Sequence, residues 1–62
     1  MKVSLQAARV NANLTQDDVA KAIGKSKKTI VSWEKGRTEI DKANFEALCR
    51  VYKCGVDDIF LP

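Results

Sequence analysis

The sequence predicts an all-α fold, a compact bundle of four or five helices, from its length and from the spacing of its apolar residues. Its 62 residues are enough for one domain with a thin core, expected to span residues 1–62. No segment alternates apolar and polar residues with β-branched enrichment, and no Asn-Gly or Asp-Gly pair marks a hairpin. Apolar residues recur instead at helical spacing.

Capping residues divide the chain into helices. Side chains that can accept a hydrogen bond from a first-turn N–H stand at three expected helix starts: Ser4, Thr15 and Ser26. Three helices are followed by a residue that tolerates the left-handed conformation: Asn13, Gly24 and Gly36. The helices are therefore expected over about residues 4–12, 15–24, 26–36 and 41–52, with a last short turn over residues 56–61.

The apolar spacing also predicts which faces are buried. One stripe in the fourth helix falls at i, i+3, i+4 and i+7: Phe45, Leu48, Cys49 and Tyr52. In the third helix, Ile30 and Trp33 are expected to face inward and to pack on Val19 and Ile23. A single tryptophan at an inward position is expected to belong to the core rather than to stack on bases.

The pair of short helices between residues 16 and 35 is the most informative element. Two helices joined by so short a turn cross at roughly 90–120°. Such a crossing needs a small residue where the backbones approach, and Ala20 meets this need. Gly24 allows the positive φ of the reversal, and Ile30 and Trp33 hold the second helix against the first. Together these residues predict a helix-turn-helix.

Positive charge is concentrated in one segment of the chain. The formal net charge is +3, yet residues 21–37 carry six cations against Glu34 alone. These cations are Lys21, Lys25, Lys27, Lys28, Lys35 and Arg37. A concentrated basic segment is what a phosphate-facing surface needs.

Composition argues against several other classes. The chain has no histidine, no glycine-rich phosphate loop and no evident nucleophile-base pair, so we expect no catalytic residue, no metal, no cofactor and no small-molecule substrate. No apolar stretch is long enough for a signal peptide or a membrane span, which favours the cytoplasm.

The two cysteines, Cys49 and Cys54, are expected to be reduced and buried, with Cys54 turning back into the core. Because they are five positions apart, their side chains are expected to point in different directions, which disfavours a disulfide.

Several segments of the chain match a known pattern: Leu14-Thr15-Gln16, Val19-Ala20, Ile23-Gly24, Ile30 and Trp33-Glu34-Lys35-Gly36. In these segments the chain resembles the phage repressor and Cro-like (XRE-type, lambda repressor-like) helix-turn-helix family. The resemblance extends from Leu5 to Phe60. It implies a small bacterial or phage-encoded transcription regulator, most simply a repressor, that binds a pseudo-palindromic double-stranded operator as a homodimer.

The resemblance also implies roles for individual residues. Gln16 would contact a phosphate at the start of its helix, and Arg9 and Glu34 fall where the family often has an ion pair. Three residues occupy the outward positions that read base edges: Lys27, Lys28 and Ser32. Three positions depart from the family pattern. Lys25 lies in the turn, where the family usually has an aliphatic residue. Glu39 and Ile40 lie where several relatives have basic residues near the minor groove.

The outward face of the third helix supports the same roles on physical grounds. With Ile30 and Trp33 facing inward, five side chains face out or lie on the flank: Lys27, Lys28, Val31, Ser32 and Lys35. Two lysines at the positive end of a helix dipole indicate an anionic partner, and lysine can donate to guanine. Val31, expected to be exposed, is either a stray surface hydrophobe or a contact for a thymine methyl. Phosphates are expected to be bound by Gln16, Lys35, Arg37 and Thr38.

Two further hypotheses concern partners. A domain this small covers few base pairs, so a symmetric dimer is expected, with its interface among Val56, Phe60 and Leu61, together with Ile40. Phe60 is alternatively a core residue. The main rival to DNA binding is a protein-interaction module of the same fold, antitoxin-like or an adaptor, whose basic helix meets an acidic protein.

Overall fold

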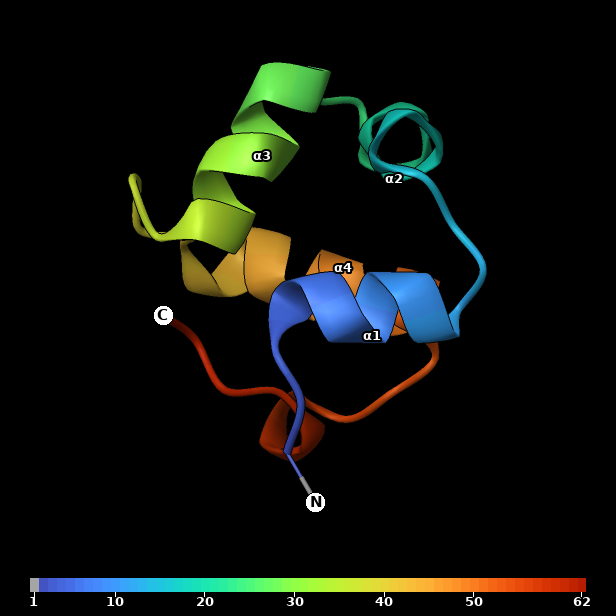
Figure 1. Ribbon diagram of the computed structural model, residues 1–62, viewed down its shortest axis with the longest axis vertical. Coiled ribbons are helices and arrows are strands. Elements are labelled where there is room, and N and C mark those ends of the chain that lie inside the picture. Colours follow the sequence, from blue (N-terminus) through green and yellow to red (C-terminus); the bar gives the residue numbers. More distant parts are fainter. Residues whose placement is uncertain (1) are drawn as a thin grey trace.

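The computed structural model describes residues 2–62 and confirms the all-α fold. Its helices are α1 (Leu5–Asn11), α2 (Gln16–Ile23), α3 (Lys27–Lys35), α4 (Lys42–Tyr52) and the 3₁₀ turn η1 (Val56–Asp58). In Figure 1, α1 and α4 lie side by side, and α2 is seen end-on while α3 runs near the plane of the picture. The second and third helices therefore cross steeply. None of the helices in residues 2–62 is both long and apolar enough to span a bilayer.

The predicted N-caps form as expected. The Ser4 hydroxyl accepts the Ala7 N–H at 3.1 Å. Thr15 and Asp18 form a reciprocal capping box, in which each side chain accepts the other residue's backbone N–H, at 3.0 and 2.9 Å. Hydrogen bonding by Thr15, chiefly from its backbone N–H, holds the pKa of the Asp18 carboxyl below the usual value. These caps set where α1 and α2 begin, and so fix the short connection between them.

The helix ends explain how the chain reverses direction. Asn13, Gly24 and Gly36 have φ values of 60°, 69° and 73°, so the predicted left-handed positions are confirmed. Lys53 also adopts this conformation, with φ 57°, although lysine pays a steric cost there. At that point the chain folds back on α4, and the Cys54 N–H donates to the Cys49 carbonyl at 3.0 Å.

This reversal corrects the expectation about the two cysteines. Cys49 is buried and Cys54 is half-buried, and both thiols are free. Burial raises the pKa of both thiols, and the Cys54 thiol is close enough to raise the pKa of Cys49 further. The expectation that they point in different directions was wrong because it rested on the five-residue spacing alone, whereas the left-handed Lys53 returns Cys54 to the side of Cys49.

The core draws residues from every α-helix and from the C-terminal segment. Its buried apolar members are Leu5, Ala8, Val19, Ala20, Ile30, Trp33, Leu48, Cys49, Tyr52 and Ile59. Trp33 is 6% exposed, in agreement with the core interpretation. Phe45 and Ile23 are half-buried and pack against the edge of this core, so the stripe in α4 is less deeply buried at its first member than expected.

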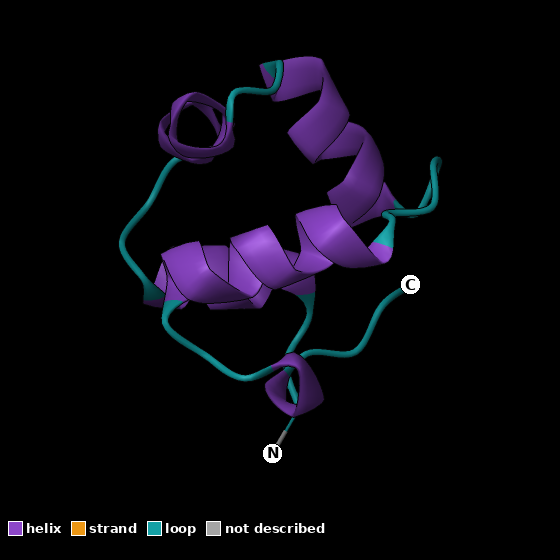
Figure 2. Cartoon of the chain, turned by 180° about the vertical axis from the view of Figure 1, so that it is seen from behind, coloured by secondary structure: helices purple, strands orange, loops and turns teal. Residues whose placement is uncertain are grey.

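The C-terminal segment differs from the prediction. The turn expected over residues 56–61 ends at Asp58, and Ile59 continues in extended conformation to form a parallel bridge with Val3. The Val3 N–H donates to the Asp58 carbonyl at 2.9 Å, and the Phe60 N–H donates to the Val3 carbonyl at 3.0 Å. Figure 2 shows the N-terminal segment passing beside η1, whereas the C-terminal end of the chain continues away from it. The extended backbone lets Ile59 reach the core, where it is 4% exposed.

Candidate nucleic-acid interface

The turn between α2 and α3 has the geometry that the sequence predicts. Ala20 is 5% exposed, and its carbonyl accepts the Lys25 N–H at 2.9 Å, which closes the turn after Gly24. A Cβ on Gly24 would meet nothing within 4 Å, so its positive φ, and not lack of space, accounts for glycine there. Lys25 is exposed, so the lysine in place of an aliphatic residue is accommodated at the surface.

The start of α3 presents cations to solvent. Ser26 caps the helix, because its hydroxyl accepts the Thr29 N–H at 3.2 Å. Lys27 and Lys28 follow in the first turn, and both are exposed. Their charges lie at the positive end of the helix dipole, where cations are disfavoured unless an anion is present. The combination of cap and lysines therefore suits an anionic partner.

Two residues on this face are less open than expected. Val31 is half-buried, so the expectation that it is exposed among lysines was wrong. Ser32 is also half-buried; with Lys28 and Thr38 it lines a surface hollow of about 180 Å³. The hollow brings one expected phosphate-binding residue, Thr38, next to two expected base-reading residues. Lys35 and Arg37, on either side of Gly36, are exposed to solvent.

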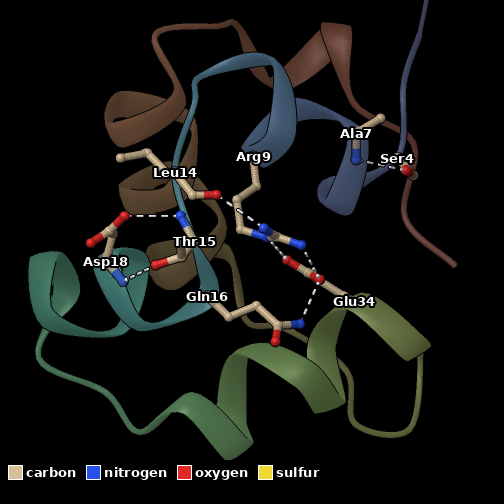
Figure 3. Close-up of polar contacts among 8 residues, drawn as sticks. All are labelled: Ser4, Ala7, Arg9, Leu14, Thr15, Gln16, Asp18 and Glu34. Atoms are coloured by element: carbon tan, nitrogen blue, oxygen red, sulfur yellow. Dashed lines mark hydrogen bonds and ion pairs between the residues drawn. The ribbon is translucent and has the colours of Figure 1, made fainter.

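A polar network behind α3 joins three parts of the chain (Figure 3). Arg9 Nε donates to Glu34 Oε2 at 2.7 Å, and Arg9 Nη2 donates to Glu34 Oε1 at 3.3 Å. Arg9 Nη1 donates to the Leu14 carbonyl at 3.0 Å. The two side chains are only 11% and 5% exposed. The structure thus contains the ion pair that the family resemblance implies, and it ties α1 to α3 and to the start of α2.

Gln16 belongs to the same network, which sequence reasoning missed. Gln16 Nε2 donates to Glu34 Oε1 at 3.1 Å, as Figure 3 shows. The two residues are 18 positions apart and lie on different helices, so no local spacing signals their contact. Gln16 also lines an open hollow of about 520 Å³ together with Thr15 and Lys27.

Tyr52 lies near this network with its hydroxyl buried. The hydroxyl has no hydrogen-bond partner among the described residues. Burial raises the pKa of Tyr52 to about 12, and the nearby Glu34 carboxylate acts in the same direction. Unfolded tyrosine titrates near 10, so between pH 10 and 12 the unfolded chain loses the proton first. The native state is therefore expected to lose about 2–3 kcal/mol of stability as the pH rises through this range.

The Tyr52→Phe variant tests this expectation. Below pH 9 it is expected to be as stable as the wild type or about 1 kcal/mol more stable, because the hydroxyl it loses is unpaired. Above pH 10 the stability of the variant relative to the wild type should increase, because only the wild type loses stability through Tyr52. Urea unfolding at a series of pH values measures both effects, and the difference between the two proteins isolates the contribution of the Tyr52 hydroxyl. A variant that is less stable than the wild type at pH 7 would show that the hydroxyl is paired in solution.

Exposed apolar residues gather in the C-terminal segment. Val56, Phe60 and Leu61 are 45%, 51% and 44% exposed, so the alternative in which Phe60 belongs to the core is wrong. Ile40 is half-buried and packs against the core. Val10 on α1, which the sequence did not single out, is 55% exposed. Pro62 lies beside Gly36, so the C-terminal segment reaches the C-terminal end of α3.

Comparison with known proteins supports one family. The family model described as helix-turn-helix matches residues 5–59. The chain is 34% identical, over 98% of its length and 92% of the relative, to an uncharacterized HTH-type transcriptional regulator of Methanocaldococcus jannaschii. It is 31% identical, over 98% of its length and 86% of the relative, to one of Archaeoglobus fulgidus. No solved structure is significantly similar. The chain therefore belongs to the XRE-type helix-turn-helix family.

Proposed function

We propose that the chain is a sequence-specific transcription regulator that binds duplex DNA by placing α3 in the major groove. The observation that carries the proposal is the exposed lysine pair at the N-terminal end of α3, on a helix that crosses α2 steeply. In helix-turn-helix proteins that end of the recognition helix meets base edges. The base-reading residues are Lys27, Lys28, Val31 and Ser32.

Phosphate binding is assigned to residues at both flanks of α3. Gln16 lies at the first position of α2, where free backbone N–H groups and the helix dipole favour an anion. Lys35, Arg37 and Thr38 surround Gly36 at the other flank, and all three are exposed. Contacts of this kind fix the register of a protein on DNA without reading sequence.

The proposed form is a homodimer that binds a pseudo-palindromic operator. It acts as a repressor of phage type in the cytoplasm. Two copies would place their α3 helices roughly 34–36 Å apart, one turn of DNA. The exposed apolar residues Val56, Phe60 and Leu61 are the proposed interface. Because Pro62 lies beside Gly36, a two-fold contact through this segment would hold the C-terminal ends of the two α3 helices near each other.

Two lysine variants test the proposal after a preferred duplex has been selected from a random pool. Lys28→Ala is expected to cost about 1–3 kcal/mol on the selected duplex and to relax preference at one position. Lys35→Ala is expected to weaken all duplexes alike, because it removes a phosphate contact. Fluorescence anisotropy with selected and scrambled duplexes measures both. If neither variant changes binding, α3 does not face the DNA; if no duplex binds, the protein-interaction module is favoured instead.

A further inference from the structure

The orientation of the Gln16 amide is set by an acceptor that cannot donate. An ionised carboxylate only accepts hydrogen bonds, so the Gln16 nitrogen, and not its oxygen, must face Glu34. That bond uses one of the two hydrogens on Nε2. The second hydrogen remains available for another acceptor.

Glu34 is itself held in place. Its side chain is 5% exposed and accepts two hydrogen bonds from Arg9, which in turn donates to the Leu14 carbonyl. The guanidinium also balances the carboxylate charge, which alone would repel a phosphate near Gln16. Gln16 therefore projects from a neutral, rigid support into an open hollow of about 520 Å³ that Lys27 also lines.

We infer that Glu34 is a positioning residue for DNA binding, which holds the Gln16 amide ready to donate its free hydrogen to a phosphate oxygen. This role presupposes the proposed duplex binding. A flexible glutamine loses rotamer freedom when it binds, whereas one already fixed by Glu34 does not, so the contact forms at lower cost. Glu34 thus contributes to DNA binding without touching DNA.

The test compares two backgrounds that both lack the ion pair. In the acceptor background, Arg9→Met with Glu34→Gln, an amide oxygen can still accept from Gln16. In the apolar background, Arg9→Met with Glu34→Met, no acceptor remains. Neither leaves a buried charge unpaired, which is what makes single variants of an ion pair unstable. Gln16→Ala is added to the wild type and to each background, and circular dichroism confirms that every protein is folded at the temperature of the assay.

Affinity for a labelled mixed-sequence duplex is then measured at low salt, because a phosphate contact is independent of sequence. Gln16→Ala is expected to weaken binding about tenfold in the wild type and in the acceptor background, the scale of a hydrogen bond to a charged group. In the apolar background the same change is expected to cost less than about twofold. Equal losses in both backgrounds would overturn the positioning role alone, whereas absence of duplex binding by the wild type would overturn the proposed function as well.

A spectroscopic readout on the free protein covers the case in which the apolar background does not fold. The two Nε2 protons of Gln16 are expected to have shifts away from random-coil values and to show a nuclear Overhauser effect to Glu34. In the acceptor background the dispersed shifts should persist. Random-coil shifts for these protons in the wild type would overturn the inference, because they would show an amide that is free to rotate before it meets DNA.

Discussion

Raising the salt concentration from 50 to 200 mM is expected to weaken binding of the chain to duplex DNA by about 10³-fold. Lys35, Arg37 and one of the two lysines at the start of α3 are exposed cations on the proposed DNA-facing surface. If each neutralises one phosphate in both copies of a dimer, about six condensed counterions are released on binding. Affinity then falls steeply with salt, because added cations oppose that release. Fluorescence anisotropy over a salt series gives the slope directly.

Matched lysine and arginine variants show whether the slope comes from the assigned surface. Lys35→Ala should reduce the steepness of the salt dependence by about 1 for each copy bound. Arg50→Ala removes an exposed cation from α4 and should leave the slope unchanged. A flat dependence in the wild type would contradict phosphate binding. Equal effects of the two variants would mean that the basic segment does not define the contact surface.

Replacing Arg9 with alanine is expected to lower the free energy of unfolding by about 3–5 kcal/mol. Among the described residues, the change leaves the Glu34 carboxylate, at 5% exposure, with only the Gln16 amide as a side-chain partner, and it leaves the Leu14 carbonyl without its arginine donor. A domain of this size has only about 3–9 kcal/mol of stability in total. Much of the variant should therefore be unfolded at 37 °C, as thermal and urea denaturation followed by circular dichroism will show.

The matched control replaces both partners of the ion pair. Arg9→Met with Glu34→Met removes both charges and fills the same space with apolar atoms, so its stability is expected to lie close to that of the wild type. Comparing Arg9→Ala with the double variant separates the cost of leaving the Glu34 charge unpaired from the contribution of the ion pair to stability. If Arg9→Ala costs less than about 1 kcal/mol, the pair is solvated in solution and behaves as a surface salt bridge.

The elements that sequence predicted best are those whose signals are local. The N-cap of Thr15 acts within the first turn of its own helix, and the left-handed glycines act at single positions. The steep crossing of α2 and α3 follows from Ala20 and Gly24, which lie within the same short segment. In each case, a few neighbouring side chains determine the backbone conformation almost unaided.

The features that sequence could not predict depend on contacts between distant residues. The Gln16–Glu34 bond requires two helices to be placed first, and Val3 pairs with Ile59 through only one bridge, too short to produce an alternating pattern. Val31 was expected to be exposed, yet it is half-buried.

The left-handed conformation of Lys53 is a local feature that the sequence also did not predict. Lysine seldom adopts that conformation, so its presence at this position gave no signal. The assignment of base-reading and phosphate-binding residues remains a prediction.

The pairing of Val3 with the segment around Ile59 has a consequence for how the molecule opens. Backbone hydrogen bonds join residues 55 or more positions apart, so neither terminal segment can fray without releasing the other. Chain termini usually exchange their amide hydrogens with solvent within the dead time of an experiment. Here the amides of Val3 and Phe60 should exchange slowly and at matching rates, through an opening event that they share.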